Sequence, residues 1–265
     1  MSVFPRVIPV LLVSEGYLVK PLRFKGGQYI GDPINAVRIF NEKQVDELLI
    51  CDIDASARKR GVNYTLIEEI ASEAFMPVGY GGGVASAAEA QRITQIGIEK
   101  VILGAAAATR PETISEISAA LGSSSTVVSV DARKRLTGGW DTAILRGRQK
   151  TGLSAIAAAR RAQEFGAGEI MVSSIDRENT FSGYDLPLIE AVSGAVTVPV
   201  IALGGAGSFA DFAPALKAGA SAVAASSIFV LNGKHRAVLI SYPTPAQIRS
   251  LANKSTLNNT QGSKS

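Results

Sequence analysis

Two glycine-rich turns have a residue pattern that points to ligand binding. YGGGVAS at residues 80–86 and LGGAGS at residues 203–208 each follow an apolar run and end on a serine that can cap a helix. Glycines let backbone N–H groups approach an anion, and a helix N-terminus adds a positive field. Tight loops alone would also use glycine. The symmetric placement, with a small-residue turn one apolar run later in each case, favours two phosphate sites formed by Gly82, Gly83, Gly104, Gly204, Gly205 and Ser226.

Asp131 is the residue best placed for acid–base chemistry. It ends the apolar run VVSVD, whereas the matching end of the first apolar run, VIPVLLV, is Leu12. A ligand with a phosphate in each glycine turn would place its reactive middle over these two positions. Asp131 would then be one half of a proton-transfer pair whose other half is missing. The alternative is that Asp131 pairs with Arg133 or Lys134.

Two polar segments supply further candidate side chains. The segment SIDRENTFSGYD, residues 174–185, has a polar density that a buried connection would not tolerate. We expect it to face the ligand, and the alternative is a surface loop held by Asp caps. Lys20, in the long segment GYLVKPLRFKGGQYIGDP, is either a mobile lid residue or a plain surface lysine. The candidates in the first segment are Asp176, Arg177, Glu178 and Thr180.

Eight apolar, β-branched runs position these residues, and each is expected to be a buried parallel strand. The runs lie near residues 6–13, 47–53, 76–80, 100–104, 126–131, 169–174, 198–203 and 222–226. Segments with helical spacing separate them, at residues 36–41, 64–74, 87–97, 111–120, 153–165 and 209–218. This alternation predicts a single α/β domain, a (βα)8 TIM barrel, over residues 1–252. Residues 253–265 are expected to form a disordered polar tail.

An internal repeat supports the barrel. An offset of 122 residues aligns Glu47 with Glu169, Asp54 with Asp176, and the first glycine turn with the second. Self-similarity of this kind is typical of repeated structural units. The barrel is therefore expected to consist of two half-barrel repeats with a pseudo-symmetric site.

A second charged cluster is expected at the opposite end of the barrel. The first, second, fourth and sixth predicted strands begin at charged residues, namely Arg6, Glu47, Lys100 and Glu169. Charges that enter a barrel floor need partners, so a structural plug of salt bridges is the simplest interpretation. The only histidine, His235, most simply belongs to the turn or helix after the eighth strand. No other histidine completes a ligand set, so we expect no metal site and no cofactor.

Charge and composition exclude several classes of function. The net charge is +4, and two of these charges, Lys254 and Lys264, lie in the tail, which leaves +2 for the barrel. A near-neutral body without a basic run does not indicate nucleic-acid binding. The apolar stretch at the N-terminus is too short to span a bilayer. Cys51 is the only cysteine, so we expect no disulfide and a reducing, cytoplasmic location.

Several long motifs resemble the HisF-type cyclase subunit of imidazole glycerol phosphate synthase, over residues 5 to about 250. They are VIP near the start, GDPINA, DELLICDIDAS, YGGGV, GAGEIMVSSIDRENTFSGYD and PVIALGGAGS. In that family, ammonia made by a partner glutaminase passes through the barrel. The cyclase uses it to close an imidazole ring on a bisphosphorylated ribonucleotide and to split off aminoimidazole carboxamide ribotide. The resemblance therefore implies a barrel synthase that is one half of a glutamine amidotransferase.

The resemblance assigns roles to the charged cluster and to the glycine turns. It identifies the four floor charges with the family's ammonia gate, and all four are kept. Glu99 lies where the family has an acidic residue that faces the HisH-type glutaminase, which implies that this partner is retained at the N-terminal face. The glycine turns match the family's phosphate-binding residues. Gly104-Ala105 replaces an Asn-Thr pair of the family, so that contact is left to backbone N–H groups.

The resemblance also shows a broken catalytic pair. The family's first catalytic aspartate falls on Leu12, its second is Asp131, and an Asp-Gly pair of the strand-six loop is replaced by Glu178-Asn179. Leucine cannot transfer a proton, and loss of a catalytic carboxylate usually costs orders of magnitude in rate. Ordinary imidazole cyclisation is therefore expected to be impaired.

The divergent segments resemble one branch of the family. VIPVLLV, GDPINAVRIFNE and GKHRAVLISYP are similar to members associated with bacterial surface polysaccharides, including O-antigen and lipopolysaccharide. These members act with a glutaminase and a third protein, an amidotransferase, to convert an acetamido group of a sugar into an acetamidino group. The resemblance therefore predicts an ammonia-channelling subunit for amidine formation, with Asp131, Glu178 and Lys20 near a phosphorylated acceptor.

Three other hypotheses remain at this stage. The chain could be a genuine cyclase of histidine biosynthesis in which Asp131 works alone or with Glu178. It could also be a non-catalytic scaffold that activates the glutaminase. An isomerase of the related two-phosphate type is the least favoured, because it would need carboxylates at both strand ends.

Overall fold

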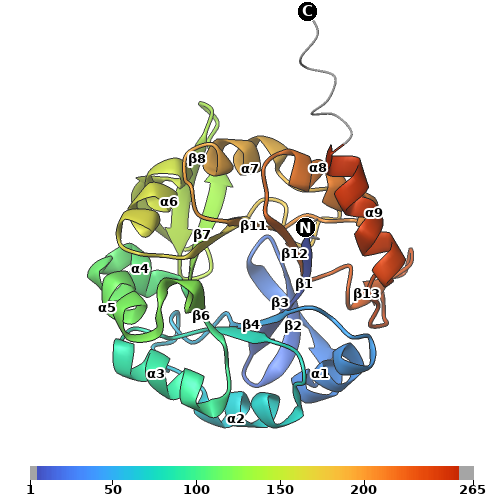
Figure 1. Ribbon diagram of the computed structural model, residues 1–265, viewed down its shortest axis with the longest axis horizontal. Helices are drawn as coiled ribbons and strands as arrows, with labels where there is room; N and C mark the ends of the chain where they lie inside the picture. The colour runs from blue at the N-terminus through green and yellow to red at the C-terminus, as the bar shows by residue number, and fades with distance from the viewer. Residues whose placement is uncertain (1–4, 257–265) are drawn as a thin grey trace, which may run out of the picture.

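The computed structural model describes the backbone of residues 5–256 and the side chains of residues 5–251. Parallel strands form a closed barrel with helices around it (Figure 1). Pairing of β10 with β7 and of β12 with β1 completes the closure. The barrel strands are β1 (Arg6–Ser14), β4 (Leu48–Asp52), β5 (Val78–Gly81), β6 (Lys100–Leu103), β7 (Thr126–Lys134), β10 (Glu169–Ser174), β11 (Val200–Leu203) and β12 (Ala222–Ala225). The eight strands and the (βα)8 barrel predicted from the sequence are confirmed.

Helices cover the outside of the barrel. Their bounds are α1 (Pro33–Glu42), α2 (Tyr64–Glu73), α3 (Ala87–Ile96), α4 (Ala105–Thr109), α5 (Glu112–Leu121), α6 (Ala155–Glu164), α7 (Leu186–Ser193), α8 (Phe212–Lys217) and α9 (Pro245–Thr256), with short 3-10 turns η1 (Ser123–Ser125) and η2 (Phe209–Asp211). Ser86 shows how a glycine turn leads into a helix: its side chain accepts a hydrogen bond from the backbone N–H of Glu89. Within residues 5–256, no helix combines the length and the apolar character needed to cross a membrane.

Two antiparallel hairpins extend the barrel at equivalent places. β2 (Tyr17–Leu22) and β3 (Lys25–Gly31) follow β1, and β8 (Trp140–Ile144) and β9 (Gln149–Ser154) follow β7. The β2–β3 hairpin lies within the ring of helices when the barrel is viewed end-on (Figure 1). A smaller hairpin of β13 (Leu231–Asn232) and β14 (Ala237–Val238) follows β12. None of the three hairpins is predicted by the sequence, because their strands lack a regular alternation of apolar and polar residues.

Apolar side chains fill the inside of the barrel. Removal of such side chains from water is worth about 1.5–3 kcal/mol each and is the main stabilising contribution to a barrel interior. A larger apolar cluster lies between the strands and the helices and includes Phe40, Ile67 and Phe212. The interior cluster consists of Ile8, Val10, Leu12, Val19, Leu49, Ile102, Val127, Met171, Ile201, Leu203, Ala222 and Ala224.

Strand register confirms that the two halves are repeats. Leu12 on β1 pairs with Cys51 on β4, and Asp131 on β7 pairs with Ser173 on β10. Cys51 and Ser173 are separated by 122 positions, the offset of the repeat. Because β1 and β7 are the first and fifth strands of an eight-stranded barrel, Leu12 and Asp131 occupy equivalent positions on opposite walls.

A helix crosses the predicted boundary between the barrel and the tail. α9 continues to Thr256, four residues beyond the predicted end of the barrel at residue 252. Ile248 and Leu251, one helical turn apart, are both buried, so an amphipathic helix holds this part of the chain. Residues 257–265 of the predicted tail lie outside the described residues.

Candidate active site at the mouth of the barrel

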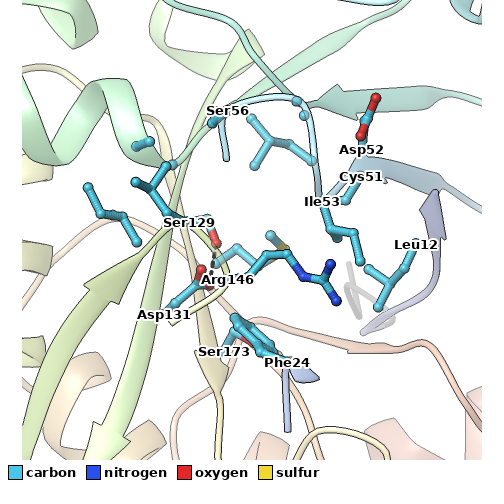
Figure 2. Close-up of a pocket in the computed structure, with 18 of the residues that line it drawn as sticks. Leu12, Phe24, Cys51, Asp52, Ile53, Ser56, Ser129, Asp131, Arg146 and Ser173 are labelled. Carbon is cyan, nitrogen blue, oxygen red and sulfur yellow. Dashed lines mark hydrogen bonds between the residues drawn. The ribbon is translucent and has the colours of Figure 1, made fainter. Parts of the chain in front are cut away.

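A cavity opens at the carboxyl ends of the barrel strands, where the βα turns begin (Figure 2). This is the end of a TIM barrel that carries active sites. The polar side chains in its wall include Asp52, Asp131, Arg146, Ser173, Glu178 and Ser226. The apolar ones include Leu12, Phe24, Ile53, Ile102, Met171 and Leu203.

Asp131 is a carboxyl group with an altered proton affinity. Ser129, two residues earlier on β7, donates its Oγ–H to Asp131 Oδ1 over 3.0 Å. Loss of solvent raises the pKa of Asp131 to about 6, with a further contribution from the nearby Glu178 carboxylate, while the Ser129 hydrogen bond acts in the opposite direction. No ion pair joins it to Arg133 or Lys134 in the described chain. A carboxyl group with a pKa near neutrality can both accept and donate a proton.

Glu178 lies beside Asp131 at the top of the loop after β10. Its side chain is buried, and Ser226 Oγ donates to Glu178 Oε1 over 2.7 Å. Burial raises the pKa of Glu178, opposed by the Ser226 hydrogen bond and by the charge of Lys20. The backbone N–H of Arg23, in the β2–β3 turn, donates to the carbonyl oxygen of Glu178 over 3.1 Å. The loop and the hairpin are therefore joined across the mouth.

The burial of Lys20 rules out the plain surface lysine of the two sequence-based alternatives, and the lid remains a prediction. Lys20 lies on β2 with 4% of its surface exposed, and its Nζ has no hydrogen-bond partner among the described residues. Burial lowers the pKa of Lys20 to about 8, against the attraction of Glu178. Pro21 and Phe24 of the same hairpin line the cavity, so the hairpin folds over the mouth and encloses the lysine.

Leu12 makes the opposite wall apolar. It belongs to the interior cluster together with Val19, and Ile53 packs against this cluster. Figure 2 shows Leu12 and Asp131 on separate strands at the two sides of the cavity. The position equivalent to Asp131 in the first half therefore has no carboxylate.

The loop after β10 is only partly directed at the cavity. Asp176 accepts a hydrogen bond from the backbone N–H of Lys134 over 2.8 Å. Arg177 donates to the carbonyl oxygens of Ser182 and Gly183, and Thr180 donates to the carbonyl oxygen of Arg177. Among the candidates expected in this loop, Glu178 lines the cavity, and the other three hold the loop in shape.

The backbone itself requires glycine at the paired positions, whatever their part in the predicted phosphate binding. All four residues at 82–83 and 204–205 have positive φ, between 74° and 144°. A Cβ at Gly83 would lie 2.5 Å from the carbonyl oxygen of Gly61, and a Cβ at Gly205 would lie 2.3 Å from that of Gly183. The first pair lines the cavity together with Gly104 and the second pair does not. Gly104 has nothing within 4 Å of a Cβ, so the space over its backbone is open.

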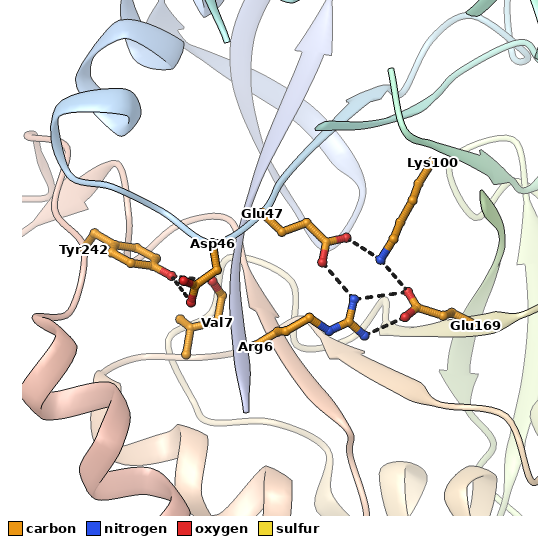
Figure 3. A network of polar contacts seen from close by, with 7 residues as sticks. All are labelled: Arg6, Val7, Asp46, Glu47, Lys100, Glu169 and Tyr242. Atoms are coloured by element: carbon orange, nitrogen blue, oxygen red, sulfur yellow. Dashed lines mark hydrogen bonds and ion pairs between the residues drawn. The ribbon is translucent and has the colours of Figure 1, made fainter. Parts of the chain in front are cut away.

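The four floor charges form a closed ring at the other end of the barrel (Figure 3). Arg6 contacts Glu47 at 2.8 Å and Glu169 at 2.6 Å. Lys100 contacts the same two carboxylates at 2.8 Å and 3.1 Å. Glu99, next to Lys100, is exposed on the outer side of this ring. The ring could act as a plug or as a gate, and the geometry allows either.

Arg146 is a cavity residue that sequence analysis missed. It lies in the β8–β9 turn, and its Nη1 donates to Asp54 Oδ1 over 2.8 Å. Asp54 also accepts from Ser14 and forms an ion pair with Arg58 at 3.6 Å. The sequence RGRQK around Arg146 reads as an ordinary polar turn, so no local signal indicates a side chain directed into the barrel mouth.

Cys51 and His235, the only cysteine and the only histidine of the sequence, do not take part in acid–base chemistry at this site. Burial, with the nearby carboxylates of Asp131 and Asp52, raises the pKa of Cys51 to about 12, so the thiol stays protonated near neutral pH. His235 is exposed in the turn between β13 and β14, as expected from its place after the last barrel strand. Groups of three or more His, Cys, Asp or Glu side chains that could hold a metal ion are absent from the described part of the chain.

The fold and the cavity define a class of protein. It is a (βα)8 barrel of two similar half-barrels, with a cluster of acid–base side chains at the carboxyl ends of the strands and an apolar interior below. A family of histidine biosynthesis proteins matches residues 6–236. The chain belongs to this family, among the HisF-type cyclase subunits of imidazole glycerol phosphate synthase.

Individual relatives cover most of the chain. A Leptospira interrogans protein, provisionally named as imidazole glycerol phosphate synthase subunit HisF, is 46% identical over 241 residues, 90% of this chain and 95% of that protein. A Pseudomonas aeruginosa protein with the provisional name of subunit hisF2 is 48% identical over 239 residues, with the same shares covered. Subunit HisF of imidazole glycerol phosphate synthase from Streptomyces griseus is 43% identical over 229 residues, 86% of this chain and 91% of that protein.

Proposed function

We propose that this chain is the ammonia-receiving synthase subunit of a glutamine amidotransferase in which ring-closing chemistry has lapsed. The observation that carries the proposal is the contrast between the two ends of the barrel. The ring of Arg6, Glu47, Lys100 and Glu169 is intact, whereas Leu12 occupies the position where the opposite wall would hold a carboxylate facing Asp131. Selection for ammonia transfer alone would preserve the charged ring and would not preserve a carboxylate at position 12.

The proposed partner is a HisH-type glutaminase at the floor of the barrel, where Glu99 is exposed beside Lys100. Ammonia would enter through the charged ring and move along the apolar interior. Neutral ammonia crosses such a lining at much lower cost than ammonium, because burying an unpaired charge is expensive. The ring therefore suits a gate that admits the neutral molecule.

The proposed reaction at the mouth is amidine formation on a phosphorylated or nucleotide-linked acetamido sugar of surface polysaccharide. A third protein, an amidotransferase, would use ATP to phosphorylate the acetamido oxygen, with release of ADP. The ammonia nitrogen would add to the carbon, the C–O bond would break as phosphate leaves, and the proton released from nitrogen would be taken up by Asp131, which has a pKa of about 6. The motif resemblance to the polysaccharide branch supports this acceptor.

A cyclase of histidine biosynthesis is the second candidate. The close approach of Asp131, Glu178 and Lys20, all with shifted pKa values, favours it, since three proton-transfer groups could compensate for the leucine. The names of the relatives also agree with this activity.

Two assays distinguish the candidates. The first measures ring closure from the bisphosphorylated ribonucleotide with free ammonium, beside the Streptomyces griseus relative. We expect turnover at least about 100-fold lower, the contribution of one general acid–base group, and comparable turnover would overturn the proposal. The second assay supplies the glutaminase, the amidotransferase, an acetamido sugar nucleotide, ATP and amide-15N glutamine. Transfer of 15N into an amidine, detected by mass spectrometry, is the expected result.

A further inference from the structure

The guanidinium of Arg146 crosses the mouth from one half of the barrel to the other. Its backbone lies in the turn between β8 and β9, which belongs to the second half. Its Nη1 reaches Asp54, which follows β4 of the first half, and its Nη2 donates to the carbonyl oxygen of Gly26 in the β2–β3 hairpin. Figure 2 shows the side chain extended between Asp131 and Leu12.

One donor of this guanidinium is left without a partner. The Arg146 side chain is 13% exposed and lines the cavity, and its Nε is buried with no acceptor in the described part of the chain. A buried N–H group normally has a hydrogen-bond partner, because leaving it unpaired costs free energy. A ligand oxygen that accepts a hydrogen bond from Nε–H would satisfy this donor.

None of the polar groups of the wall forms a hydrogen bond with Nε among the described residues. Leu12, at the place equivalent to Asp131, is apolar. Asp54 already accepts hydrogen bonds from Ser14 and from Nη1 of Arg146 and pairs with Arg58. Nε is therefore the donor of Arg146 that a ligand oxygen can satisfy.

The backbone of the turn is held in an unfavourable conformation. Leu145 and Arg146 have φ of 54° and 61°, followed by Gly147 at 72°. Left-handed backbone is unfavourable for residues with a Cβ, and such strain persists mainly where the surroundings enforce it, often at binding sites. The strained turn aims the arginine inward and away from solvent.

We propose that Arg146 is an oxyanion-binding residue of the mouth, distinct from the glycine turns, and that it takes a carboxylate or phosphate oxygen of the acceptor. The planar guanidinium matches oxyanions, and with Nη1 bound to Asp54 and Nη2 bound to the carbonyl oxygen of Gly26, Nε is the donor left for a ligand oxygen. The inference rests on the proposed function only where it names the acceptor as the ligand. It adds that the acceptor carries an acidic group near the position where ammonia arrives.

The test follows the Nε–H signal of Arg146 by 15N NMR, with the full chain, during titration with glucuronate, glucose 1-phosphate or neutral glucose. We expect a saturable shift with at least one acidic sugar and none with glucose. A response to glucuronate alone identifies a carboxylate site, and a response to glucose 1-phosphate alone identifies a phosphate site. Arg146→Lys keeps the positive charge but removes the planar guanidinium and its Nε–H donor. It should weaken binding of the responding sugar by about tenfold.

The matched control is Arg148→Lys, at an exposed position two residues further along the same turn. It should leave the affinity unchanged. The proposal is overturned if the Arg146 signal is unmoved by both acids while backbone N–H signals of the glycine turns shift, or if both lysine variants bind equally well. The readout requires no turnover, so absence of amidine formation in the reconstituted system would count against the proposed function and not against this site.

Discussion

Leu12 and Asp131 stand at equivalent register positions on opposite walls of the barrel, the first paired with Cys51 and the second with Ser173. The duplicated fold would allow two carboxylates to face each other across the mouth, and this chain has one. Asp131 therefore lacks a partner on the opposite wall that could take up a proton as it gives one away. Any reaction that needs simultaneous acid and base help from opposite sides is disfavoured.

Leu12→Asp should place a carboxylate on β1, opposite Asp131. We expect ring closure from the bisphosphorylated ribonucleotide to rise by about 100-fold, the usual contribution of a general acid–base group. Leu12 is 7% exposed, so the substitution should also lower the free energy of unfolding by about 1–3 kcal/mol. Steady-state kinetics with free ammonium and urea denaturation measure the two effects.

The control for this substitution is Leu12→Asn, which has a similar size and polarity but cannot transfer a proton. It should show the loss of stability without the gain in rate. Equal rates for the two variants would mean that the missing carboxylate is not what limits ring closure.

Asp131 should make stability depend on pH. Its pKa is about 6 in the folded protein against an ordinary 3.8, so the folded state holds a proton that the unfolded state releases. The free energy of unfolding should fall as pH rises from about 4 to 6 and then level off. Asp131→Asn removes this loss, and we expect it to be more stable than the native chain by about 1–3 kcal/mol at pH 8 and equally stable near pH 4.

Urea denaturation at both pH values measures the difference. Asp141→Asn is the control, because its carboxylate is partly exposed and has only ion pairs of 3.6 Å. Its effect should stay below about 0.5 kcal/mol and should not grow between pH 4 and pH 8. A pH-independent difference for Asp131→Asn would rule out the raised pKa as its cause.

The barrel could be predicted from the sequence because each buried parallel strand is a nearly continuous apolar run. The same criterion fails for β3, whose residues KGGQYIG are mostly exposed, and for α4, which is short and has no side-chain cap. The helix α7 was also not predicted from the sequence, although Asp185 caps it and Pro187 lies in its first turn. Elements with short or irregular patterns become visible only through their tertiary contacts.

The glycine turns allow a test that separates folding from binding. Gly83→Ala and Gly205→Ala place a Cβ against a backbone carbonyl at positive φ, and each should lower the free energy of unfolding by about 2–4 kcal/mol. Gly104→Ala meets open space, so its cost should stay within about 1 kcal/mol. A comparable loss of stability in all three variants would contradict this distinction.

Cys51 should resist alkylation in the folded protein. Its pKa of about 12 leaves about 1000-fold less thiolate at pH 8 than an ordinary cysteine has, and only the thiolate reacts. Because the sequence has a single cysteine, mass spectrometry after iodoacetamide treatment reports on this residue alone. The rate in denaturant serves as the reference, and a native rate within tenfold of it would show that the thiol is neither buried nor surrounded by carboxylates.

The site residues predicted from the sequence lie on barrel strands or in the turns that follow them. Asp131 lies on β7 beside Ser173 of β10, and the turns after β5 and β12 carry Gly82 and Ser226. Lys20 and Arg146 reach the mouth through hairpins, and their burial depends on how each hairpin folds across the barrel. Local sequence carries no information about that packing, which is why the sequence left two alternatives open for Lys20 and gave no signal for Arg146.

Lys100→Met should separate ammonia transfer from chemistry at the mouth. Lys100 joins the carboxylates of Glu47 and Glu169, which are 5% and 12% exposed, so its removal leaves buried negative charge and should cost about 1–3 kcal/mol in stability. With the glutaminase present, we expect more glutamine to be consumed per molecule of product, while activity with free ammonium stays within about twofold of the native value. Lys150→Met is the control, since Lys150 is 76% exposed on β9 and remote from the ring. An unchanged ratio of glutamine to product in Lys100→Met would show that the ring is a structural plug and that ammonia does not pass through it.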